Sequence, residues 1–183
     1  MKNNRTNKKK IKKTIITILM IVVCFLLQTT LVQNIRVAGV IPNLMLLVVV
    51  FIAYLNSVYY GMTVGIVVGL LFDFLYASLI GVNMLAFLLI GYFCGLLSRL
   101  YRNGNYLIPL VMISISEFVY GIITYFTDFL LRGKLNIGYY FGKVILPELV
   151  YTIVVGILLY GFVCWMYEDR DLKGGNILWL MVL

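Results

Sequence analysis

Long apolar runs separated by short polar segments make up most of the chain. A membrane-spanning helix needs about 20 mainly apolar residues. We therefore predict an all-α integral membrane protein, a bundle of six transmembrane helices. Residues 56–61 leave room only for a tight turn, so a second helix that fails to cross fully is an open alternative. The six predicted helices lie at residues 14–32, 44–60, 62–79, 83–99, 106–131 and 144–167.

Basic residues mark the ends of several runs. Seven of the 15 Lys and Arg residues form a basic arm within residues 1–13, Arg99 and Arg102 follow the fourth run, and two more lie in the tail, residues 168–183. Lys and Arg are retained on the cytoplasmic side, so we expect both termini in the cytoplasm, although the loop after the fifth run is also basic. An arm placed directly before an apolar run is typical of a flank beside anionic lipid, so we expect no nucleic-acid partner.

The composition agrees with a membrane protein and excludes several chemistries. The chain is 63% hydrophobic and 12% charged, and its mean hydropathy is +1.03. This is more apolar surface than a soluble domain can bury. The chain has no histidine, and its cysteines, Cys24, Cys94 and Cys164, lie far apart in apolar runs. Because no nucleophile, metal-ligand set or phosphate-binding loop is recognisable, we expect no enzyme, no metal and no cofactor.

Small residues repeat at four-residue steps along the third run and just beyond it. A helix places such residues on one slowly drifting face. Small side chains let another backbone approach closely, and van der Waals contact drives helix association in lipid. Two interpretations stay open: a helix-packing groove with one polar contact, and a ligand or proton site. The repeat consists of Gly61, Gly65, Gly69, Asp73, Ala77 and Gly81, and the fourth run adds Gly91 and Gly95.

Acidic residues within the apolar runs are candidate functional residues. An acidic side chain at a helix centre costs about 2.5–3.5 kcal/mol to insert, so Asp73 and Glu117 should face the bundle interior, a cavity or a partner. No Lys or Arg of the runs is available to pair with them. We therefore expect protonated carboxyls bonded to Ser, Thr, Asn or Tyr groups. Glu148, five residues after Lys143, should be partly hydrated.

Several short motifs, in their order and spacing, resemble a known family. The chain is similar to the rod shape-determining protein MreD over nearly its whole length. The matching motifs are Leu26-Leu27-Gln28, Pro42-Asn43-Leu44, the stripe from Gly61 to Asp73, Gly81, and Gly91-Tyr92 followed by Gly95.

The resemblance implies a fold and a set of partners. The fold would be a six-helix bundle like the S components of energy-coupling-factor transporters. The protein would sit in the bacterial cell membrane, in the cell-elongation complex with MreC, the MreB filament and the peptidoglycan polymerase and transpeptidase. The resemblance implies partner-docking or cavity-lining roles for Pro42, Asn43, Gly65, Gly69 and Asp73. Their own polarity adds Glu117 and Glu148 to this candidate set.

A second function from another class stays open. An S component binds a small molecule, so the chain would then capture a vitamin or a lipid-linked precursor in an outward cavity. The two hypotheses differ in their partners, because an S component docks onto a transporter and a shape subunit binds MreC.

Overall fold

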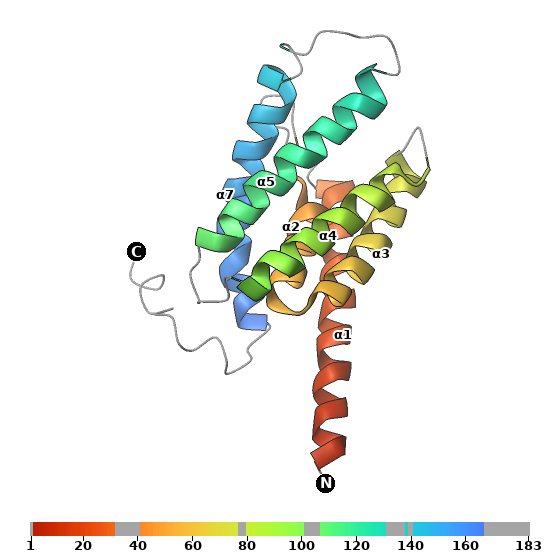
Figure 1. Cartoon of the computed structure of the whole chain (residues 1–183), viewed down its shortest axis with the longest axis vertical. Coiled ribbons are helices and arrows are strands. Elements are labelled where there is room, and N and C mark those ends of the chain that lie inside the picture. Colours follow the sequence, from red (N-terminus) through yellow and green to blue (C-terminus); the bar gives the residue numbers. More distant parts are fainter. Residues whose placement is uncertain are drawn as a thin grey trace.

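The computed structural model describes residues 2–31, 41–76, 80–100, 107–130, 138 and 141–166, and these residues are mostly helical (Figure 1). Five helices are long and apolar enough to cross a membrane. The prediction of an all-α, multi-pass membrane protein is therefore confirmed. The elements are α1 (Lys2–Leu26), α2 (Leu44–Leu55), α3 (Val58–Tyr76), α4 (Val82–Leu100), α5 (Leu107–Thr124) and α7 (Leu146–Met166), with π-helical segments η1 (Leu27–Leu31), η2 (Tyr125–Leu130) and η3 (Phe141–Ile145).

The second helix differs from the others, because it is short and completely enclosed. All 12 residues of α2 are buried. At 1.5 Å per residue it is about 18 Å long, well short of a hydrocarbon core of about 30 Å. It packs against α1, α3, α4, α5 and α7. The expected single segment at residues 44–60 is therefore wrong: α2 ends before Asn56 and Ser57, and α3 already begins at Val58.

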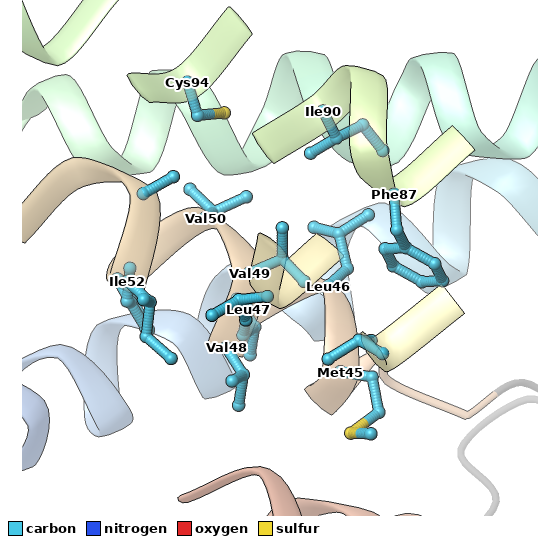
Figure 2. Close-up of a cluster of buried hydrophobic side chains, with 14 of the residues drawn as sticks. Met45, Leu46, Leu47, Val48, Val49, Val50, Ile52, Phe87, Ile90 and Cys94 are labelled. Carbon is cyan, nitrogen blue, oxygen red and sulfur yellow. The ribbon is translucent and has the colours of Figure 1, made fainter. Parts of the chain in front are cut away.

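The sequence of α2 explains its central place. The helix reads LMLLVVVFIAYL and is apolar on every side, which is typical of a helix surrounded by other helices. Figure 2 shows its side chains, among them Leu46 and Val50, beside Phe87, Ile90 and Cys94 of α4. Protein neighbours, not lipid, surround this helix.

The first helix begins earlier than expected. The helix starts at Lys2 rather than near residue 14, so the basic arm is a helical extension of the first apolar segment. The segment contains neither Gly nor Pro to interrupt a helix. In Figure 1 the N-terminal part of α1 projects beyond the other helices. The tail, residues 168–183, lies outside the described residues. The cytoplasmic placement of both termini stays a prediction, because the structure does not show which side of a membrane the chain ends face.

Helices α3 and α4 form an antiparallel pair whose backbones touch (Figure 1). A Cβ at Gly65 would overlap the carbonyl of Phe87, and one at Gly69 would overlap the Cα of Met84. The contact is reciprocal, because a Cβ at Gly95 would lie 2.6 Å from the Cα of Val58. These distances leave no room for a side chain, so the glycines of both helices form the packing surface of the pair.

A matched set of glycine substitutions tests this packing. We expect Gly65→Ala and Gly69→Ala each to lower the free energy of unfolding by about 1–3 kcal/mol, because the added methyl meets backbone that cannot move aside. A Cβ at Gly161 would meet none of the described residues within 4 Å outside its own helix turn, so Gly161→Ala should be neutral or slightly stabilising. Thermal unfolding of the full chain in lipid nanodiscs measures the difference. Equal melting temperatures for all three variants would contradict the close contact.

Candidate functional site

The Asp73 side chain, near the end of α3, binds the start of α4. Its carboxyl accepts hydrogen bonds from the N–H groups of Gly81 at 2.9 Å, Asn83 at 3.1 Å and Met84 at 3.0 Å. Gly81 has a φ of 100°, a conformation that favours glycine. Asp73 therefore caps α4 across the turn that joins the two helices.

These contacts correct the expected chemistry of Asp73. The expected hydrogen bonds of Asp73 to Ser, Thr, Asn or Tyr groups are wrong, since its three partners among the described residues are backbone N–H donors. A carboxyl oxygen can accept from the N–H groups at a helix N-terminus, which have no partner within the helix. Periodicity places Asp73 on the glycine face but does not show that the next helix begins within its reach.

The buried start of α2 needs hydrogen-bond partners of its own. The first N–H groups of a helix have no partner within the helix, and here they lie inside the bundle. The Asn43 Oδ1 accepts from Leu46 N at 3.1 Å, and Asn43 N donates to Thr152 Oγ1 at 3.1 Å. Leu44 N donates to Gln28 Oε1 at 2.9 Å. Residues of η1, which follows α1, and of α7 thus meet at the N-terminus of α2.

Two glutamates join the same region. Glu117 of α5 is 2% exposed, and its side chain lies beside Glu148 and Thr152 of α7. The Oε2 atom of Glu117 is buried and has no hydrogen-bond donor among the described residues. We call Gln28, Asn43, Glu117, Glu148 and Thr152 the α2 polar cluster.

The candidate residues named from the sequence fall into two groups. Asn43, Glu117 and Glu148 belong to the α2 polar cluster. Pro42 is buried and is the residue directly before Asn43 in the chain. Gly65, Gly69 and Asp73 lie instead at the α3–α4 contact. The structure thus assembles the candidates at two places, not around one site.

Three further residues join these groups and were not among the candidate site residues, although Gln28 belongs to one of the motifs that resemble the family. Gln28 and Thr152 complete the α2 polar cluster. Tyr120 donates its hydroxyl to Asn83 Oδ1 at 3.0 Å and so joins α5 to the start of α4. The spacing could have indicated Thr152, which lies four residues after Glu148 and on the same helix face. Tyr120 follows Glu117 by three residues, so one face of α5 contacts both groups.

Comparison with known proteins identifies one family. Residues 8–169 of the 183-residue chain match the family described as rod shape-determining protein MreD. The matched range contains both groups of candidate residues. Comparisons with curated proteins and with solved structures return no significant match. The likeness to transporter S components therefore stays a prediction.

A substitution at Asp73 distinguishes capping from neutral hydrogen bonding. Asparagine has one acceptor oxygen, and its NH₂ group would face N–H donors. We expect Asp73→Asn to lower the free energy of unfolding by about 1–3 kcal/mol and to speed amide exchange at Gly81 and Met84. Ser114→Ala is the control, because within the described part of the chain the Ser114 hydroxyl donates to the Leu110 carbonyl of its own helix, at 2.9 Å, and to no other helix. An Asp73→Asn protein with wild-type melting and exchange would refute the capping role.

Proposed function

The chain belongs to the MreD family of rod shape-determining proteins, and on this premise we propose that it is a non-enzymatic membrane subunit of the bacterial cell-elongation complex. In this role it binds MreC and helps couple MreB filaments to the peptidoglycan polymerase and transpeptidase. It lies in the cell membrane with both termini in the cytoplasm. Its contribution is a fixed shape within the membrane, not a chemical reaction.

The observation that supports this role is that the residues matching the family motifs make contacts between helices of this chain. Gly65 and Gly69 contact the α4 backbone, and the Asp73 carboxyl is occupied by the N–H groups of α4. Such residues make a hairpin rigid. A rigid surface loses little conformational entropy when a partner binds, which favours complex formation.

The outer side of the same hairpin offers the surface for such contacts. Phe74 is 76% exposed and Phe93 is 55% exposed, and the rings of Tyr92 and Phe93 meet edge to face with centroids 5.4 Å apart. In a membrane these side chains face either lipid or another membrane helix. Because α3 and α4 are fixed against each other, their outward side chains keep constant positions for a helix of MreC.

A second candidate function, an S-component-like binder, is supported by the α2 polar cluster. Acidic residues within membrane helices commonly mark substrate or ion sites, and Glu117 and Glu148 meet inside this bundle. This function predicts a transporter partner and a nutritional phenotype. The shape function predicts neither.

A glycine pair in a complementation experiment tests the proposal. We expect Gly69→Leu, which forces α3 and α4 apart, to leave a depleted strain rounded and to reduce recovery of MreC by at least about tenfold. The matched Gly161→Leu, at an exposed position with free space, should restore rods and normal recovery. Cell width, MreC co-purification and membrane abundance are measured together.

The two candidate functions give different results in this strain. Rounded cells without a nutritional requirement are the expected phenotype of depletion. Normal rods that need an added vitamin would contradict the shape function and support the transporter function. Wild-type width and MreC recovery with Gly69→Leu, at wild-type abundance, would contradict the role of the rigid hairpin.

A further inference from the structure

The paired glutamates of the α2 polar cluster have no established role in the proposed scaffold. Glu117 and Glu148 come from different helices, α5 and α7. Gly121 packs against Ile145 and Ile113 against Gly156, so the two glutamates lie between these contacts and beside each other. Neither carboxyl forms an ion pair with a Lys or Arg of the described residues. Helix α2 and segment η1 carry no basic residue, while Arg99 of α4 and Lys143 of η3 are exposed. The pair therefore lacks a basic partner.

The hydrogen bonds around Glu117 show which donor is missing. Thr152 Oγ1 accepts from Asn43 N at 3.1 Å, which leaves the hydroxyl proton of Thr152 free to be donated to the Glu117 carboxyl. The other carboxyl oxygen of Glu117 lacks a hydrogen-bond donor, because Oε2 is buried and no donor among the described residues reaches it. If both glutamates were ionised, two carboxylates would face each other with only lone pairs between them.

We propose that Glu117 and Glu148 form a proton-binding site that holds one shared proton between their carboxyls. The proton replaces repulsion with a hydrogen bond and provides the donor that the buried Glu117 carboxyl lacks. One negative charge remains on the pair. The chain from Glu117 through Thr152 to Asn43 N ends at the N-terminus of α2, whose dipole stabilises that charge.

The position of Glu148 provides a route for the proton. Glu148 lies in the first turn of α7 and is half-buried, whereas Glu117 is almost completely enclosed. Leu146 and Pro147 separate Glu148 from η3, where Gly142 and Lys143 are exposed. A proton therefore reaches the pair through Glu148 from that end of the bundle. This inference does not depend on the family assignment, because it uses only the contacts between α2, α5 and α7.

Infrared spectroscopy of the full chain in lipid nanodiscs tests the site directly. The chain contains three glutamates, Glu117, Glu148 and Glu168. Labelling with ¹³C-glutamate shifts their carboxyl bands away from those of aspartate and lipid. At neutral pH we expect one protonated-carboxyl band from glutamate, which shifts in D₂O.

Three conservative variants assign the band. Glu117→Gln and Glu148→Gln should each remove the wild-type band or shift its frequency, because the hydrogen bond between the two carboxyls can no longer form. Glu168→Gln makes the same chemical change in the tail and should leave the band at full intensity. The melting temperature of each variant, expected to equal the wild-type value or exceed it, checks that the bundle is folded.

Other spectra would overturn the proposal. A wild-type chain without a protonated glutamate band, or with the intensity of two, would show that no single proton is shared. An unshifted band at full intensity in either Glu117→Gln or Glu148→Gln would show a carboxyl protonated independently of its neighbour. A band that appears only when sodium is replaced by choline would identify a metal-cation site instead.

Discussion

The enclosed position of α2 is the constraint on which the rest of the structure depends. A helix buried along its whole length cannot leave its first N–H groups to water, so their acceptors must come from protein. Gln28 and Thr152 provide them from η1 and α7, and Asn43 caps the helix itself. The ends of α1 and α7 are thereby fixed relative to α2. Thr152 also lies beside Glu117, so the residue that accepts from the start of α2 connects α7 to α5 as well.

The α3–α4 hairpin completes the enclosure by a different interaction. Its helices approach so closely that glycine is required at the contact, and Asp73 fixes the start of α4. Phe87 of α4 then packs on Tyr120 of α5 with ring centroids 5.1 Å apart, while the Tyr120 hydroxyl bonds Asn83. Helix α5 thus contacts the α3–α4 hairpin through Tyr120 and contributes Glu117 to the α2 polar cluster. A shape subunit built in this way presents a fixed outer surface, which agrees with membership in the MreD family.

Hydropathy and periodicity predicted the membrane class, the approximate helices and the glycine face of α3. They left open whether the second helix crosses fully, because an apolar run has the same hydropathy whether lipid or protein surrounds it. The polar pair Asn56 and Ser57 interrupts the apolar stretch, and α2 ends directly before it. The partners of Asp73 and the pairing of Glu117 with Glu148 were missed. Periodicity shows which face of a helix a residue occupies, but the partner on that face depends on tertiary packing.

Amide hydrogen exchange at the start of α2 tests this account most directly. The first N–H groups of a helix open to water exchange quickly, whereas those of an enclosed and fully bonded helix exchange as slowly as its centre. For the full chain in lipid nanodiscs, we predict that the amides of Asn43, Leu44 and Leu46 are as strongly protected as that of Val50 in the middle of α2. Rapid exchange at these three amides, with Val50 still protected, would show that the start of α2 is open to water and would contradict the account.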